Sequence, residues 1–562
     1  MAETGEEYYN LGAYTRAIST DSPEAQLWFD RGLIWSYSFN HEESLRCFQR
    51  AAEHDPECAL IHWGLLYAIG PNYNKTWRLS GAADVEKTTE YAAGVLVQAR
   101  RASNGSPLER ALVEAIATRF APVGAIPEDL GTLNEAYAVA MRKVYREYGS
   151  DDLDVAALFA DSLMCIRPRA LWDLDTGEPT TNDTLEAVAV LDAAFTQPGS
   201  HDHPALSHLY IHLMEMAADP GIAVPAANRL RNLVPEASHM AHMATHIDIA
   251  VGDYREGIKS NQDAVTSDDK FFAREDPTVM YTVYRSHTIQ VLVYAAMMAG
   301  RWEDAITAAN RLPKILPPEF LSIKSPSMAD WAEFYLATDA HVLIRFGRWE
   351  EIVQLQIPTD QQLMPITTAM YRYARGIALG VLGRLDEARA EAKEFEAVRS
   401  AVPEDRMNGT TSRAFFILEV ASLMLEGELL YREGHIETAF ATLREGIKKE
   451  DNLAYCDPPL RMQPLRHVLG ALLLEQGRLS EAEEIYKQDL GLSKNLPRRK
   501  SRPNNVWGWQ GLYECYLRSG KQEEALKIKS RHDDAMALAD IPVAASCFCR
   551  LSTVNKSNVG CC

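Results

Sequence analysis

The sequence has no apolar run long enough to cross a lipid bilayer. Its acidic start, MAETGEEYYN, also lacks the apolar stretch of a secretory signal. We therefore expect a cytoplasmic protein without a membrane partner. Positive charge is scarce too, because 57 Lys and Arg stand against 78 Asp and Glu, for a net charge of −21. This balance argues against a nucleic-acid partner.

The motifs of common nucleotide-dependent and serine-dependent enzymes are missing as well. There is no Gly-rich phosphate loop, no Gly-x-Ser-x-Gly elbow and no dinucleotide-binding fingerprint. Hydride transfer with a bound nucleotide and hydrolysis by a Ser-His-Asp triad therefore lack support. None of the nine cysteines falls between residues 201 and 290, where the histidines gather. This disfavours a thiolate-rich structural zinc site.

What the sequence does have is a helical repeat of 34 residues. Residues 25–58 match the tetratricopeptide pattern, in which large residues of one helix fill the gaps left by small residues of the next. Trp28, Gly32 and Trp35 take the expected places in the first helix, and Phe48 takes its place in the second. Later units keep the glycine that ends a first helix: Gly252, Gly300, Gly347, Gly383, Gly434, Gly477 and Gly520.

These repeats predict an all-α fold, a tetratricopeptide-like right-handed superhelix of helix-turn-helix units. A chain of 562 residues is too long for one compact core, which agrees with a repeat array. We expect an N-terminal cap over residues 1–24, one continuous superhelix over 25–540 and a disordered C-terminal tail over 541–562. The concave groove of the array is expected to be rich in histidine over 201–290.

Seven of the fifteen histidines lie between His201 and His246. His208 and His242 are 34 residues apart, and so are His212 and His246. Residues separated by one full repeat occupy equivalent places on neighbouring helices, so one His-x-x-x-His pair is predicted to lie beside a second. A solenoid needs no such arrangement for stability, which indicates a functional site.

The same repeat register extends the cluster to a third helix. His287 is equivalent to His239, and Gln290 is equivalent to His242. Imidazoles and a carboxylate at helical spacing are ligands for zinc, copper or non-haem iron. We therefore predict a transition metal ion held by His208, His212, His239, His242, His246 and His287. The alternative is a polar groove whose histidines bind an acidic or aromatic ligand.

Motifs along nearly the whole chain carry a wider resemblance. They are Gly70-Pro-Asn-Tyr-Asn74, Leu163-Met-Cys-Ile-Arg-Pro168 with Leu171-Trp172, His208-x3-His212-x2-Glu215, His239-x2-His242-x3-His246, His287, Asp457-Pro-Pro459 with Pro464 and Arg466, and Asn505-Val-Trp507. With these motifs the sequence resembles, from about residue 25 to 530, a large family of tetratricopeptide-domain proteins of bacteria and fungi. The resemblance implies an all-helical superhelix and assigns no activity by itself. Two positions depart from the family pattern: Gln290 stands where a second histidine is usual, and Arg461 where an aromatic residue is usual.

Five residues outside the metal set are predicted to contact a substrate. Asn72 and Asn74 lie in a loop that replaces a tight repeat turn and is expected to close one end of the groove, although such side chains often bind their own backbone. Trp172 is either a groove residue or a packing residue. Gln290 is expected to border the metal, since an amide oxygen is a poorer ligand than imidazole. Arg466, like Arg461 and Arg167, would hold an anionic substrate or form an internal salt bridge.

The function predicted from these observations is that of a metal-dependent oxidoreductase or oxygenase. Copper, iron or zinc would act on a small organic substrate in the lumen, with a place in specialised metabolism, and Glu215, His239 and His287 would take part in catalysis. The alternative is the ordinary task of such repeats, a scaffold whose concave groove binds a peptide or protein partner. Stacked histidines have no physical purpose in a groove that only grips a peptide.

Overall fold

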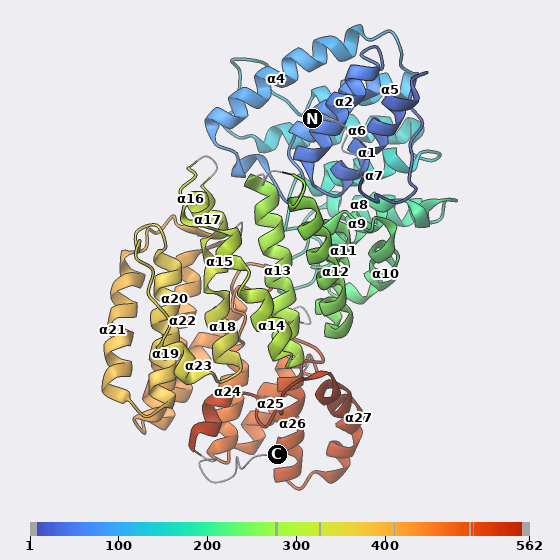
Figure 1. Cartoon of the computed structure of the whole chain (residues 1–562). Coiled ribbons are helices and arrows are strands. Elements are labelled where there is room, and N and C mark those ends of the chain that lie inside the picture. Colours follow the sequence, from blue (N-terminus) through green and yellow to red (C-terminus); the bar gives the residue numbers. More distant parts are fainter. Residues whose placement is uncertain are drawn as a thin grey trace. The chain divides into compact units, whose positions relative to one another are not determined.

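The computed structural model describes residues 8–275, 279–324, 327–409, 411–493, 496–497 and 500–553. Its residues fall into two compact units, Met1–Ile247 with Gln262–Tyr281, and Asp248–Asn261 with Thr282–Cys562. Both units are built of α-helices (Figure 1). None of the described helices is long and apolar enough to cross a membrane.

Helical hairpins follow one another along the first unit. Its helices are α1 (Pro23–Tyr37), α2 (His41–His54), α3 (Ala59–Ile69), η1 (Trp77–Leu79), α4 (Ala82–Arg101), α5 (Pro107–Ala117), α6 (Gly131–Tyr148), α7 (Leu153–Met164), α8 (Asn182–Phe195), η2 (Ser200–Asp202), α9 (Pro204–Met214), η3 (Pro220–Ala223) and α10 (Val224–Leu233). The helices α11 (Ser238–Val251), α12 (Tyr254–Phe272) and α13 (Val279–Ala299) contribute to both units.

The second unit continues the helical pattern and adds one short hairpin. Its helices are α14 (Trp302–Ala309), α15 (Leu312–Ile315), α16 (Pro318–Leu321), α17 (Met328–Ala332), η4 (Glu333–Ala337), α18 (Thr338–Arg345), α19 (Trp349–Val353), α20 (Pro365–Val381), α21 (Leu385–Ala401), α22 (Ala414–Arg432), α23 (Ile436–Asp451), α24 (Leu465–Glu475), α25 (Leu479–Asp489), α26 (Val506–Arg518), α27 (Gln522–Leu538) and η6 (Phe548–Thr553). The strands β1 (Met407–Asn408) and β2 (Ser412–Arg413) pair antiparallel, with Met407 opposite Arg413.

The packing of the first hairpin explains the repeat pattern. A Cβ atom added at Gly32 of α1 would lie 2.8 Å from the Phe48 ring of α2, and one added at Gly64 of α3 would lie 2.5 Å from it. Phe48 therefore fills the space that two glycines leave open on the helices to either side. The predicted turn glycines are also confirmed: all seven have a φ between 66° and 87°, the left-handed C-cap that glycine adopts most easily. The fold is all-α and tetratricopeptide-like.

The end of the described chain differs from the predicted tail. Within 541–553, Val543, Ala545 and Cys547 are buried. The Ser546 hydroxyl lies 2.6 Å from the Tyr486 hydroxyl and donates to the His467 carbonyl. Residues 541–553 therefore do not match the expected disordered tail, because this segment is largely apolar and its side chains are buried, with Ser546 held against α24 and α25. Residues 554–562 lie outside the described part.

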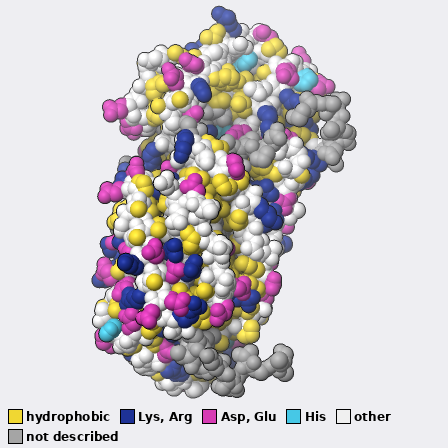
Figure 2. All heavy atoms as spheres, turned by 60° about the vertical axis from the view of Figure 1, so that its left-hand side comes forward, with side chains coloured by type: hydrophobic (Ala, Val, Ile, Leu, Met, Phe, Trp, Pro, Cys, Tyr) yellow, Lys and Arg dark blue, Asp and Glu magenta, His cyan; other side chains and the backbone are white. Residues whose placement is uncertain are grey.

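The surface carries mixed charge. In Figure 2, acidic and basic side chains are interspersed over the face that is drawn, and little histidine is visible there. This agrees with the burial of the histidines that the sequence grouped together.

Candidate metal centre

Two helices of the first unit carry the histidine cluster. His208 and His212 lie one turn apart on α9, and Glu215 caps the end of that helix. His239, His242 and His246 lie on α11. None of these six residues is more than 3% exposed. They are buried, whereas the sequence analysis expected them to line an exposed groove.

Three imidazoles approach one another most closely. The ring centroids of His208 lie 4.9 Å from those of His212 and 5.0 Å from those of His239. One ligand nitrogen from each of the three rings lies within 4.8 Å of the other two. Two ligands of one zinc or copper ion, each at about 2.1 Å, are separated by up to about 4 Å, so small side-chain rotations would bring this triad onto one ion.

The Nδ1 side of the cluster is held by oxygen acceptors. His208 Nδ1 lies 2.6 Å from the Tyr37 carbonyl oxygen. The Glu215 carboxylate accepts from two rings, with Oε1 2.9 Å from His212 Nδ1 and Oε2 2.5 Å from His246 Nδ1. A carbonyl or carboxylate oxygen only accepts, so each Nδ1 carries the proton and each neutral ring presents a lone pair at Nε2.

The Nε2 side is open in two of these rings. Nε2 of His208 and Nε2 of His212 are buried and have no hydrogen-bond partner among the described residues. His246 Nε2 lies 3.1 Å from His242 Nε2, so those two rings share one hydrogen bond. A buried nitrogen with no partner costs free energy unless a ligand occupies it.

Burial favours the neutral form of three imidazoles, those of His208, His212 and His239. It lowers the pKa of His208 and of His239 well below the usual range, and it lowers the pKa of His212 to about 4 although Glu215 opposes the shift. Burial alone would raise the pKa of Glu215, but His246 and His212 hold that pKa well below its usual range. The site therefore combines neutral rings with one carboxylate, the protonation state that metal binding requires.

Two aromatic rings that the sequence analysis did not select wall the triad. Phe39 lies 4.5 Å from the His208 ring and 5.4 Å from the His239 ring, between centroids. It has a φ of 57° and holds the turn position where later repeats have glycine. A non-glycine residue there is strained, and such strain gathers at functional sites. A bulky residue in place of the turn glycine is the sequence signal that could have identified Phe39.

The second wall comes from the loop 70–74. Tyr73 is buried with its ring 4.8 Å from the His212 ring, and its hydroxyl has no partner among the described residues. Asn72 Oδ1 accepts from the backbone N–H groups of Asn74 and Lys75, and Asn74 Oδ1 accepts from Arg169 at 2.7 Å. The amides that we expected at the substrate thus shape the loop, and Tyr73 is the residue that this loop presents to the cluster.

A small cavity reaches His208. It is lined by Tyr37, Phe39, Tyr67, Ala157, Ala205, His208 and Leu209, and about 10 Å³ of it is open to the centre of a water-sized molecule. This is room for one molecule of water or diatomic size. The walls that face His208 are largely apolar.

The other predicted site residues have varied surroundings. The Trp172 indole donates to the Leu213 carbonyl at 2.6 Å, which ties it to the end of α9. Arg466 forms a bidentate salt bridge with Asp451, at 2.7 and 2.8 Å, so of the two alternatives it takes the internal one. His287 and Gln290 lie on α13 in the second unit, and their part in the site stays a prediction.

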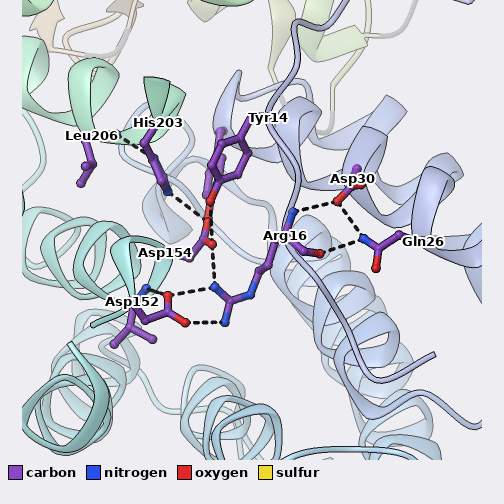
Figure 3. Close-up of polar contacts among 10 residues, drawn as sticks. Tyr14, Arg16, Gln26, Asp30, Asp152, Asp154, His203 and Leu206 are labelled. Atoms are coloured by element: carbon purple, nitrogen blue, oxygen red, sulfur yellow. Dashed lines mark hydrogen bonds and ion pairs between the residues drawn. The ribbon is translucent and has the colours of Figure 1, made fainter. Parts of the chain in front are cut away.

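Figure 3 shows a buried acid, Asp154, with polar contacts to several residues. Asp154, at the start of α7, accepts hydrogen bonds from Tyr14 at 2.7 Å, Arg16 at 2.6 Å and His203 at 3.1 Å. It also accepts from the Tyr37 hydroxyl at 2.5 Å. Tyr37 supplies the carbonyl that holds His208, and the His203 side chain caps the first turn of α9. Asp154 thus fixes both the partner of His208 and the start of its helix.

Comparisons with known proteins give no closer assignment. No protein-family model matches the chain, and no curated protein matches it. Among solved structures, yeast Tom70 is 11% identical over 90% of each chain, with a TM-score of 0.27. Naa15/Naa10 bound to HypK-THB is 11% identical over 92% of this chain and 70% of that chain, with a TM-score of 0.22. At these scores neither likeness carries an argument about function.

Proposed function

We propose that the protein binds a transition metal ion through His208, His212 and His239, and that it is a metal-dependent oxidoreductase or oxygenase. Two observations carry the proposal. The buried Nε2 atoms of His208 and His212 have no partner in the described part of the chain, and one ring nitrogen from each of His208, His212 and His239 lies within 4.8 Å of the other two. Neutral imidazoles are ligands that copper, iron and zinc all accept. A cytoplasmic location belongs to the same proposal.

Glu215 acts in this proposal as a positioning residue. Both of its oxygens accept from Nδ1 atoms, one of His212 and one of His246. A carboxylate that fixes the tautomer and orientation of ligand histidines is common around protein metal sites. His242 and His246 lie beside the triad and are additional candidate ligands in this proposal. Catalytic roles for His239 and His287 are also part of the proposal.

Bound copper or iron would supply dioxygen activation, and zinc would supply Lewis-acid activation. We favour a redox metal because a mostly neutral imidazole ligand set suits copper or iron at least as well as zinc, and the cavity beside His208 has room for one small molecule. Phe39 and Tyr73 exclude bulk water from the imidazoles. The small organic substrate would approach this walled site from outside the cavity.

The rival function is a scaffold that binds a peptide or protein. Tetratricopeptide-like arrays serve that purpose widely. The fold alone favours the scaffold function. A scaffold function, however, does not explain the buried imidazoles, which a bound partner could not contact.

The test is elemental analysis of protein purified without chelator. We expect about one copper, iron or zinc ion per chain in the wild type. The double variant His208→Ala/His212→Ala should lose it and keep its helical circular dichroism, while His201→Ala, an exposed neighbour, should keep the metal. Full metal content in the double variant would show that the ligands lie elsewhere, and a wild type free of transition metal would overturn the proposal.

A further inference from the structure

The second unit contains a buried arginine that forms no ion pair with the described residues. Arg461 lies between α23 and α24 and is 1% exposed. Among the described residues its one oxygen partner is the Tyr373 hydroxyl, 3.0 Å from Nη2. Nη1 reaches only the Met370 sulfur, at 4.0 Å, and Nε has no partner in the part of the chain that the structure describes.

Arg466 shows how the same unit treats an ordinary buried arginine. It lies five residues further on and pairs with both carboxylate oxygens of Asp451. Five N–H donors of a guanidinium need several acceptors, and burying such a charge without them is costly. Arg461 forms no ion pair with any carboxylate of the described residues, so its fork of donors is available to something else.

Further polar atoms without partners lie beside Arg461. Gln463, also buried, donates from Nε2 to the His341 carbonyl at 2.7 Å, and its Oε1 has no partner among the described residues. His341 is buried on α18, and its Nδ1 has no partner there either. Burial, and then the charge of Arg461, lower the pKa of His341 to about 3, so its ring is neutral and is free to donate or accept.

A second arginine strengthens the positive potential. Arg345 lies one turn after His341 on α18 and is buried. It donates to the Ser546 carbonyl at 3.1 Å and lies over the Trp507 ring, again without an ion pair in the described chain. The charge of Arg461 and that of Arg345 both act on the Tyr373 hydroxyl. The acid near Arg461 is Glu450, which accepts from the Leu465 N–H at 3.3 Å.

We propose that Arg461, with the His341 ring beside it, binds the carboxylate group of a small organic acid. The Nε and Nη2 edge of a guanidinium matches the two oxygens of a planar carboxylate, and Nη2 carries a second hydrogen besides the one that Tyr373 accepts. A phosphate dianion fits less well, because Glu450 repels its two charges more strongly than the single charge of a carboxylate. This site lies within the second unit and does not depend on the metal proposed for the first.

The experiment compares unfolding midpoints of the full-length protein in sodium acetate, sodium benzoate, sodium phosphate and sodium chloride at equal ionic strength. A ligand that binds only the folded state raises the midpoint. We expect acetate or benzoate to raise it above the chloride value and phosphate to raise it less. No rise with either carboxylate would overturn the proposal, and a larger rise with phosphate would overturn the choice of carboxylate.

Three variants locate the effect. Arg461→Met places an apolar side chain beside Met370 and Met424. We expect it to abolish the rise of the unfolding midpoint in carboxylate. Arg461→Lys keeps the charge but loses the fork, and we expect about tenfold weaker binding. Arg466→Met removes an equally buried arginine and should destabilise the fold while leaving the rise intact. If Arg461→Met keeps the rise, or Arg466→Met abolishes it, Arg461 is not the binding group.

Discussion

Two buried polar clusters of the first unit share one residue, Tyr37, and differ in whether their polar atoms have hydrogen-bond partners. Asp154 accepts hydrogen bonds from Tyr14, Arg16, Tyr37 and His203. The rings of His208 and His212 are held at Nδ1 but have no partner at Nε2 among the described residues. Tyr37 belongs to both, because its hydroxyl donates to Asp154 and its carbonyl accepts from His208.

The difference separates a stabilising cluster from a binding one. A buried polar group whose partners all come from the protein contributes to the fold, and removing it leaves those partners unsatisfied. A buried ring that is held at Nδ1 and has no protein partner at Nε2 is oriented to bind a ligand. We therefore expect substitutions at Asp154 to cost stability and substitutions in the triad to cost ligand binding.

The largest expected effect is at Asp154. Asp154→Ala leaves the Arg16 guanidinium buried with one acid fewer, and breaking a buried ion pair costs about 3–5 kcal/mol. Urea unfolding should show this loss. Asp151→Ala, an exposed neighbour, should change the unfolding free energy by less than about 0.5 kcal/mol. Equal losses in the two variants would remove the distinction between the clusters.

The next effect is on metal affinity. Glu215→Gln offers only one acceptor oxygen in place of two, so His212 or His246 loses its Nδ1 partner. We expect metal affinity to fall about 10–100-fold, measured by competition with a chelator, with little change in helix content. Glu236→Gln, near the surface of the same unit, is the control. Complete loss of metal would instead make Glu215 a direct ligand.

The dependence of stability on pH separates two kinds of buried acid, one whose pKa is raised and one whose pKa is lowered. Burial raises the pKa of Asp339, whose carboxylate accepts from the Tyr371 hydroxyl, from 3.8 to about 6. The folded state therefore binds the proton more tightly, and the free energy of unfolding should fall as pH rises from about 4 to about 6. In Asp339→Asn, which has no carboxyl group to titrate, this decrease in the free energy of unfolding should be absent.

The pKa of Asp154 is shifted in the opposite direction, so its effect on the pH dependence of stability is also opposite. Burial would raise its pKa, but Arg16 and its other donors hold that pKa below the usual range. Its stabilisation is therefore present above pH 3.8 and is lost only as pH falls below that value. Thermal midpoints of wild type, Asp339→Asn and Asp154→Asn between pH 3 and pH 8 distinguish the two. The same slope in wild type and Asp339→Asn from pH 4 to 6 would contradict the assignment.

The smallest effect is expected at Tyr73. Its hydroxyl is buried without a partner among the described residues, so Tyr73→Phe should change the unfolding free energy by less than about 1 kcal/mol. The metal should be retained, because the aromatic wall against His212 stays. Differential scanning calorimetry and elemental analysis check both. A loss of several kcal/mol would show that the hydroxyl has a partner that stabilises the fold.

The helices and the grouping of the histidines could be predicted from the sequence. Period and turn glycines are local signals, and the 34-residue offset placed His208 beside the helix of His239 and His242. The groups that orient the rings could not be predicted. Tyr37 lies 171 residues from His208, and Asp154 lies 138 residues from Arg16. No periodic pattern links such pairs. The first depends on how α1 packs against α9, and the second on the path of the segment before α1.

The central claim is a metal ion held by imidazoles, with Glu215 outside the coordination shell. X-ray absorption spectroscopy of the metal-loaded protein tests it most directly. The account predicts nitrogen ligands at about 2.0–2.1 Å with the multiple scattering of at least three imidazoles and no carboxylate oxygen. A shell dominated by oxygen, or one unchanged in His208→Ala/His212→Ala, would contradict it.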